Sequence, residues 1–299
     1  MSGLGMVRIA SSSGVSIYCP ADGKFSFFNS PYPAHRAFAG VDIYPNRGFG
    51  EDAPSPVSGE VLAVRRVSCP RGRGFKGSES DYVILIRSLE NPDRVVKILH
   101  VNPVVESGDV IKHGQTIGVL IRSGYFDFWT DPHIHVEVRY PHDPIRARGG
   151  LMIDRVMEVP RDVEPIEEIR GVVVKACPEY IMISLNVDSE FGLSADVDGS
   201  ASFLDAGIPH YGWLGVHLDG TLRVGGVVRL CGFPIGVIEA THHGMGLSKC
   251  GKFRILLEGV EVGLSLHLYP RLKPLLKVVP YRLGAIKCEL GEEVSLVIS

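Results

Sequence analysis

The sequence predicts an all-β protein, with a compact β-sandwich or barrel in its first half and a second β-rich domain after it. Short runs rich in Val and Ile alternate with turn-like segments, and the 299 residues include 35 glycines and 20 prolines. β-Branched runs favour strands, whereas glycine and proline favour turns. Strands at this spacing, without helical segments between them, are typical of a mostly antiparallel sandwich or barrel.

The strand-like runs follow one another along the whole chain. In the first half they lie at 7–10, 15–19, 40–45, 55–67, 82–88, 95–101, 116–121 and 131–139, and in the second half at 171–176, 180–185, 226–232, 236–240, 253–258, 262–269 and 293–299. Between the halves, residues 151–168 combine charged clusters with two prolines, which suits a connection between domains. We therefore expect a domain at 1–150, a linker at 151–168 and a β-rich domain of unknown role at 169–299.

Composition and charge exclude several classes of protein. The chain is 45% hydrophobic and 22% charged, as expected for a globular protein with a real core. A net charge of −3 provides no overall attraction to nucleic acid, so no nucleic-acid partner is expected. No apolar run approaches 18 residues, which argues against a membrane span, and the first 20 residues do not resemble a signal peptide, so a cytoplasmic location is expected. The six cysteines form no CxxC pair and are expected to be buried thiols; the sequence does not indicate an oligomeric state.

The stretch DPHIHVEVR at 131–139 carries the most informative pattern. His133, His135 and Glu137 alternate with apolar residues, so in a strand the two histidines would share one face. Two imidazoles on a rigid strand suit metal binding, or one ligand beside one proton-handling group. The alternative is a surface strand that happens to carry two histidines. Glu137 would either orient a histidine or lie exposed.

Four segments occur in an order that resembles a known family. They are AGVDIYP, which contains Asp42; APSPVSGEVLAV; VVKILHVN, which contains His100 and is followed by VVESGDVIKHGQTIG; and DPHIHVEVR. Together, over about residues 35–145, they resemble the lysostaphin-type (LytM-like) zinc metallopeptidases, whose small β-sandwich core is of the duplicated-hybrid-motif type. The resemblance implies hydrolysis of a peptide amide through metal-bound water, with a peptide or a peptide-bearing polymer as substrate.

The resemblance also implies roles for four residues. Asp42 and His135 match two zinc ligands of the family, and His100 and His133 match two histidines that assist the chemistry. Zinc with three protein ligands keeps a fourth position for water and lowers the pKa of that water to about 7. Imidazoles beside it would accept the proton and stabilise the oxyanion of the attacked amide.

One ligand position departs from the family pattern. Four residues before Asp42, where the family has a histidine, this chain has Phe38. His35 is the nearest histidine, but its odd offset of seven residues places it on the opposite face of a regular strand. His35 is therefore predicted as the third ligand only if this segment bulges or loops back. The alternatives are His113, His142, a cysteine, or no three-ligand site at all.

Two other interpretations remain beside the peptidase. Because Phe38 replaces a ligand, the chain would be a catalytically inactive relative that acts as a binding or regulatory module. The half-motifs SPVSGEV and GDVIKHGQTIG also resemble biotinyl or lipoyl carrier domains, but Lys97 lies within an apolar strand and not at the hairpin turn that such domains need.

A basic loop holds Arg65, Arg66, Arg71, Arg73 and Lys76. It would be either a solvated hairpin or a holder for carboxylate or phosphate at the rim of a cleft.

Overall fold

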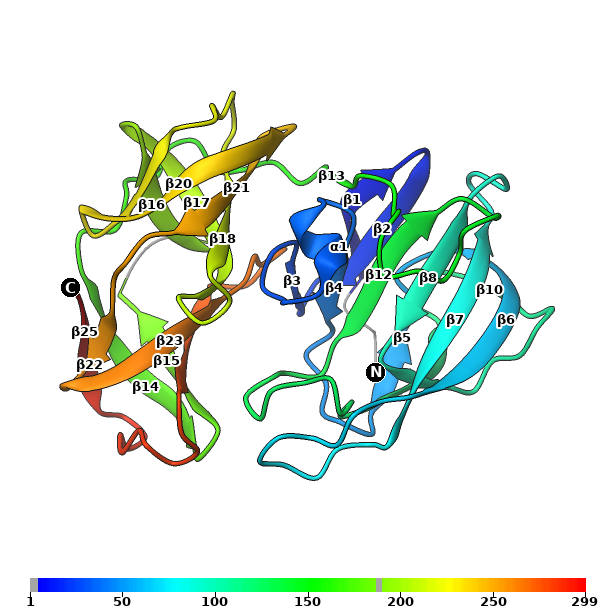
Figure 1. The fold of residues 1–299 in the computed structure, drawn as a ribbon, viewed down its shortest axis with the longest axis horizontal. Helices are drawn as coiled ribbons and strands as arrows, with labels where there is room; N and C mark the ends of the chain where they lie inside the picture. The colour runs from blue at the N-terminus through cyan, green and yellow to red at the C-terminus, as the bar shows by residue number, and fades with distance from the viewer. Residues whose placement is uncertain (1–4, 187–189) are drawn as a thin grey trace. The chain divides into compact units, whose positions relative to one another are not determined.

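The computed structural model describes residues 5–186 and 190–299, and it confirms the all-β prediction (Figure 1). Every pairing between named strands is antiparallel, as the short connections predicted. The chain forms two compact units. One holds the chain up to Phe27 together with Tyr32–Met157, and the other holds Phe28–Pro31 and Glu158–Ser299.

A seven-stranded sheet forms the centre of the first unit, in the order β10-β6-β7-β8-β12-β4-β3. Its strands are β3 (Lys24–Ser26), β4 (Val41–Tyr44), β6 (Gly59–Ser68), β7 (Ser80–Ser88), β8 (Val95–Leu99), β10 (Val110–Ile111) and β12 (Ile134–Arg139). β12 lies between β8 and β4, and all six of its residues are buried. The histidine-bearing strand is therefore held on both edges by backbone hydrogen bonds.

Two three-stranded sheets complete the first unit. One is ordered β13-β1-β2 and the other β5-β11-β9. Their strands are β1 (Met6–Ser12), β2 (Val15–Pro20), β5 (Asp52–Pro54), β9 (Val101–Pro103), β11 (Thr116–Leu120) and β13 (Asp154–Arg155). β13 lies within the segment predicted as a connection, and pairs there with β1.

The register around β12 brings distant residues into opposed pairs. His135 lies opposite Asp42 on β4, and Glu137 lies opposite Lys97 on β8. Opposed residues of antiparallel strands have Cβ atoms about 4.5–5.5 Å apart and point to the same face. This register places a carboxylate beside each of two basic side chains inside the sheet.

The second unit is a single twelve-stranded sheet whose pairings close on themselves. Its strands are β14 (Ile169–Cys177), β15 (Tyr180–Leu185), β16 (Leu193–Val197), β17 (Ser200–Ile208), β18 (Trp213–His217), β19 (Val227–Leu230), β20 (Phe233–His242), β21 (Met245–Cys250), β22 (Ile255–Leu257), β23 (Val260–Leu266), β24 (Leu275–Pro280) and β25 (Glu293–Ile298). β16-β19-β20-β21-β18-β17 form one closed circuit, because β17 pairs back with β16. β23-β22-β25-β14-β15-β24 form a second, closed by β24 and β23, and β17 joins the two.

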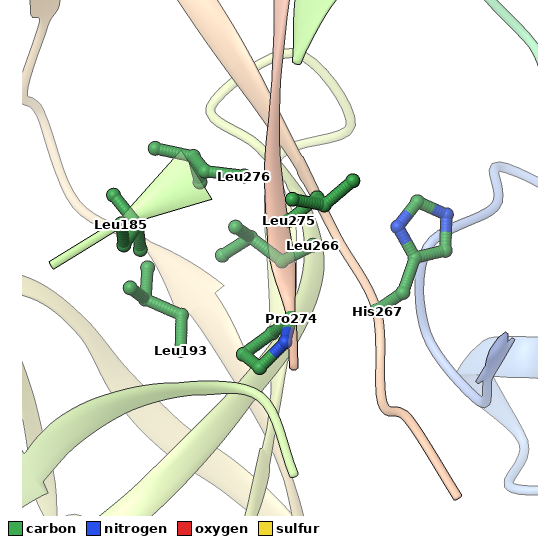
Figure 2. Close-up of a pocket in the computed structure, with 7 residues that line it drawn as sticks. All are labelled: Leu185, Leu193, Leu266, His267, Pro274, Leu275 and Leu276. Atoms are coloured by element: carbon green, nitrogen blue, oxygen red, sulfur yellow. The ribbon is translucent and has the colours of Figure 1, made fainter. Parts of the chain in front are cut away.

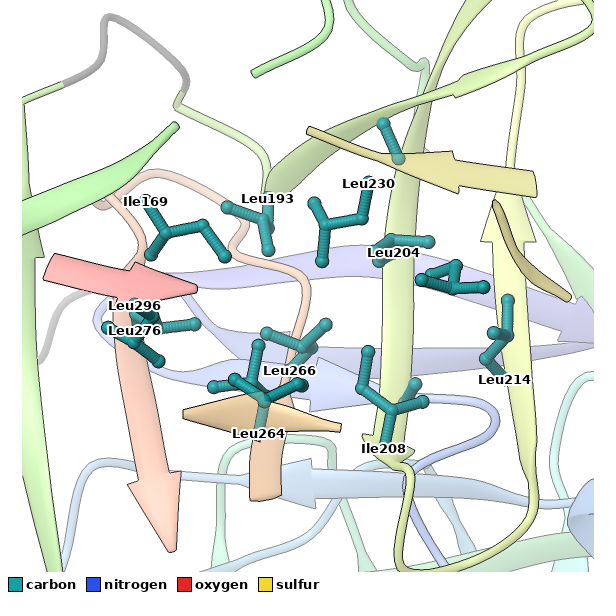
Figure 3. Packing of buried hydrophobic residues seen from close by; sticks show 14 of the residues in the cluster. Ile169, Leu193, Leu204, Ile208, Leu214, Leu230, Leu264, Leu266, Leu276 and Leu296 are labelled. Carbon is teal, nitrogen blue, oxygen red and sulfur yellow. The ribbon is translucent and has the colours of Figure 1, made fainter. Parts of the chain in front are cut away.

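Aliphatic side chains fill the second unit. Leu204, Ile208 and Leu214 from one circuit pack in the same cluster as Leu264 and Leu296 from the other (Figure 3). Closed circuits leave few unpaired strand edges, which suits short strands that could not be stable alone. Among the described residues, no helix has the length and apolar character needed to cross a membrane.

Candidate metal centre

His35 reaches the sheet from a short helix and not from a strand. α1 (Pro33–Arg36) begins with proline, whose φ is already helical and whose missing N–H needs no partner at a helix start. Just after the helix, Phe38 takes a left-handed φ of 55°. The chain therefore turns back before β4 begins, and this turn replaces the regular strand on which His35 and Asp42 would point to opposite faces.

Phe38 itself belongs to the hydrophobic core. Its side chain is 4% exposed, and its carbonyl accepts a hydrogen bond from the Ile153 N–H at 2.8 Å. A residue other than glycine with a positive φ is strained unless its surroundings hold it. Phe38 thus has a packing role in this chain.

Three potential ligand atoms meet near the N-terminal end of β12. His35 Nε2 lies 3.2 Å from His135 Nδ1 and 3.3 Å from Asp42 Oδ1, and His135 Nδ1 lies 2.8 Å from Asp42 Oδ1. All three side chains are buried. Tetrahedral zinc with bonds of about 2.0–2.1 Å sets its ligand atoms about 3.3 Å apart. The separations are therefore close to those that one zinc ion requires.

The hydrogen bonds behind the two histidines determine which nitrogen faces the site. His35 Nδ1 lies 2.6 Å from the Phe27 carbonyl oxygen, and His135 Nε2 lies 3.3 Å from Glu137 Oε1. Because these oxygens only accept, each of these nitrogens carries its hydrogen. The lone pairs of neutral imidazoles would then face each other across 3.2 Å, with Asp42 Oδ1 beside both nitrogens, so a proton or a cation is needed among these three atoms.

Asp42 supplies the negative charge of the cluster. Burial works against its ionised form, but His35, His133 and His135 hold the pKa of its carboxyl well below the ordinary value. Within the described part of the chain, its buried Oδ2 atom has no hydrogen-bond partner. A buried carboxylate oxygen of this kind is costly unless it is paired or binds a metal. The residues present therefore fit a zinc ion.

A buried charged network supports His135 from behind. Glu137 Oε1 lies 2.7 Å from Lys97 Nζ, and Glu137 Oε2 lies 2.5 Å from Arg139 Nη1. Burial opposes ionisation, but His135 and Lys97 lower the pKa of Glu137 to about 2. Glu137 thus stays a carboxylate and fixes the orientation of the His135 ring. Removing one partner of a buried ion pair typically costs about 3–5 kcal/mol.

Gly40 provides the space in which the His135 ring lies. A Cβ atom at this position would come within 2.9 Å of His135 Cε1 and 3.1 Å of Ala34 Cβ. Any side chain at position 40 would therefore displace either the imidazole or the helix that carries His35. Glycine is required here for close approach and not for a special φ.

His100 stands beside the cluster, held by a carboxylate that sequence reasoning did not identify. His100 Nδ1 lies 2.6 Å from Asp81 Oδ2, and the His100 N–H donates to Asp81 Oδ1 at 3.0 Å. The Ser123 hydroxyl donates to Asp81 Oδ2 at 2.7 Å. Burial would raise the pKa of Asp81, but His100 and Ser123 hold it well below its ordinary value. Asp81 therefore fixes the orientation of the His100 ring and leaves His100 Nε2 available. The only sequence signal for this role of Asp81 is its position at the start of β7.

His133 lies between His100 and Asp42. Its ring is 4.9 Å from that of His100 and 4.7 Å from that of Phe126, centre to centre, and its Nε2 is 3.8 Å from Asp42 Oδ2. Its Nδ1–H donates to the Asp131 carbonyl at 2.9 Å. Burial, together with the nearby His100, lowers the pKa of His133 to about 4 despite the opposing effect of Asp42. Neutral His133 thus presents an accepting nitrogen at pH 7.

The alternative ligands lie in other surroundings. His113 stacks on Tyr18 at 4.1 Å between ring centres, and His142 stacks on Tyr140 at 5.4 Å. Both are exposed. Neither belongs to the cluster of potential ligands formed by His35, Asp42 and His135, and no cysteine does.

A small pocket in the second unit lacks comparable chemistry. It is lined by Leu185, Leu193, Leu266, His267, Pro274, Leu275 and Leu276 (Figure 2). His267 is the polar side chain of this lining, and its Nε2 lies 3.3 Å from Asn29 Nδ2. The pocket has no carboxylate or cation in its lining and is a gap in leucine packing.

Comparisons with known proteins concern the first unit. Residues 16–155 match the family model described as "Domain of unknown function (DUF8155) N-terminal domain", a segment that contains all five predicted site residues. A search of curated proteins found no match. Among solved structures, the chain matches a zinc-containing peptidase from Vibrio cholerae at 22% identity and a TM-score of 0.25, covering 44% of this chain and 45% of that one. The chain therefore spans less than half the length of that peptidase.

Proposed function

We propose that the protein is a zinc-dependent metallopeptidase of the lysostaphin type, which hydrolyses an amide bond of a peptide or of a peptide-bearing polymer. The observation that carries the proposal is the meeting of His35 Nε2, Asp42 Oδ1 and His135 Nδ1 within 3.3 Å of one another. The order of sequence motifs around these residues supports it. The same three residues would hold the zinc ion, which supplies Lewis acidity toward water and the substrate carbonyl.

The flanking histidines would handle the protons and the developing charge. His133 is neutral at pH 7 and presents Nε2 toward the cluster, so it is suited to accept a proton from the attacking water. His100 is oriented by Asp81 through Nδ1, which leaves Nε2 to donate a hydrogen bond, when protonated, to the oxyanion or the leaving amine. The side chain of Phe126 packs against both rings, 4.7 Å from each, and limits their rotation.

Metal content and peptide cleavage test the proposal together. Protein purified without chelator, loaded with zinc and dialysed should retain stoichiometric zinc and should cleave amide bonds in a mixed peptide pool, as detected by mass spectrometry. Zinc without cleavage of any peptide would contradict the peptidase and favour the binding module. The absence of zinc after loading would contradict the metal site itself.

The protonation of His135 predicts how the stability of chelator-treated protein depends on pH. Burial lowers the pKa of His135, but Asp42 and Glu137 outweigh it and raise the pKa to about 9 from an ordinary value of 6.5. A raised pKa stabilises the fold fully below about pH 6.5, and this contribution is lost as the pH rises through about 9. The shift corresponds to about 3 kcal/mol. Urea unfolding of chelator-treated protein between pH 6 and 10 should show this loss, whereas zinc-loaded protein should show a smaller one; identical pH profiles would contradict the prediction.

A further inference from the structure

The most positively charged part of the first unit is a hairpin beside the proposed site. This basic hairpin consists of residues 65–79, which end β6, connect it to β7 and carry Arg65, Arg66, Arg71, Arg73 and Lys76 against the single carboxylate Glu79. All five cationic side chains are exposed. Within the described residues, none of them forms an ion pair. The chain as a whole has a net charge of −3, so this concentration of positive charge is local.

The tip of the basic hairpin is fastened to the segment at 122–126. The Ser78 N–H donates to the Arg122 carbonyl at 2.7 Å, and the Phe75 ring lies 4.4 Å from the Arg122 guanidinium. The Tyr125 hydroxyl donates to the Ser68 carbonyl at 3.1 Å. Figure 1 shows the cyan connection between β6 and β7 running beside the green segment that leads into β12.

The segment at 122–126 in turn touches the proposed catalytic histidines. Ser123 donates to Asp81, the carboxylate that holds His100, and the Phe126 ring packs against the rings of both His100 and His133. The basic hairpin is therefore separated from these two histidines by one layer of chain. A peptide bound beside these histidines on the side of the 122–126 segment would therefore come close to the hairpin.

We propose that the substrate is an acidic peptide, with Asp or Glu side chains near the cleaved bond that bind the arginines and lysine of the basic hairpin. Cleavage of such a peptide rests on the proposed function, but its binding does not. Exposed arginines bind carboxylates through paired hydrogen bonds, and a local field of one sign raises the rate of encounter with ligands of the opposite sign. Within the described residues no carboxylate pairs with these five side chains, although Arg66 Nε donates a hydrogen bond to the Ser80 hydroxyl at 2.8 Å. The positive charges are therefore available to an acidic ligand.

Binding of two fluorescein-labelled peptides tests the proposal independently of catalysis. One peptide alternates Gly with Asp and Glu, and the other replaces these by Asn and Gln. The zinc-loaded His133→Ala variant should cleave substrate much more slowly and still bind it. In anisotropy measurements it should bind the acidic peptide about tenfold more tightly than the Asn/Gln peptide. This preference should vanish in the additional R71E/R73E variant and should weaken as salt screens the charges.

A matched variant controls for net charge. Arg8 and Lys112 are exposed, and Lys112 follows β10, which pairs with Gly59–Glu60 at the end of β6 opposite to the hairpin. R8E/K112E changes the net charge as much as R71E/R73E but should keep the preference for the acidic peptide. Three outcomes would each overturn the proposal. The two peptides would bind equally well, the two double variants would lose the preference for the acidic peptide to the same extent, or a single-stranded oligonucleotide would compete more strongly than the acidic peptide. Binding of the acidic peptide without its cleavage by the unsubstituted, zinc-loaded protein would contradict only the proposed peptidase.

Discussion

Replacing His135 by Ala is expected to abolish zinc binding and peptide cleavage together. His135 Nδ1 lies within 3.2 Å of both other proposed ligand atoms, so its loss would leave two protein ligands where three are needed. Removing a residue that merely orients a ligand already costs about 10–100-fold in metal affinity, so the loss of the ligand itself should cost more than about 100-fold. Asp42→Asn and His35→Ala should have the same effect. Zinc per chain, measured by mass spectrometry of the element after dialysis, and cleavage assays test this result.

Phe38→Leu provides the control for His35, because position 38 is where the resemblance to lysostaphin-type peptidases would place the third ligand. Phe38 packs in the core, so this variant should retain zinc even if it unfolds at lower urea concentration. Circular dichroism should confirm that each variant is folded before its zinc content is compared. Retention of zinc by folded His35→Ala protein would show that His35 is not the third ligand.

Replacing His100 or His133 by Ala is expected to slow cleavage while zinc remains bound. Neither ring belongs to the ligand cluster, yet both pack on Phe126 beside it. Loss of a general acid or base typically lowers the rate by about 10²–10⁴-fold. The turnover rate and the zinc content of each variant test this prediction, and loss of zinc from either variant would assign that histidine to the metal instead.

His142→Ala is a suitable control for these two variants. His142 is exposed and stacks on Tyr140, apart from the cluster. Its replacement should leave turnover unchanged. A similar loss of rate in His142→Ala would indicate that removing any histidine from this unit disturbs the fold, and the roles of His100 and His133 would lose their support.

Many of the longer strands, and the shared face of His135 and Glu137, could be predicted because they depend on local pattern. In β12, His135 and Glu137 alternate with buried aliphatic residues, and a period of two specifies which side chains share a face. The roles of Asp42 and His135 as ligands stay predictions. Their proximity, however, follows from the pairing of β12 with β4. No local pattern states which strands pair across more than ninety residues of chain.

The sequence by itself determined the all-β class and the alternation within β12. It also showed that Phe38 stands where the resemblance would place a histidine ligand. Only the tertiary structure decided where His35 lies, because its position depends on the turn after α1 and on the space that Gly40 leaves for the His135 ring. Only the structure revealed that Asp81 holds His100 and that Lys97 pairs with Glu137. Periodicity is a property of neighbouring residues, whereas a buried charge is stabilised by partners that the whole fold brings to it.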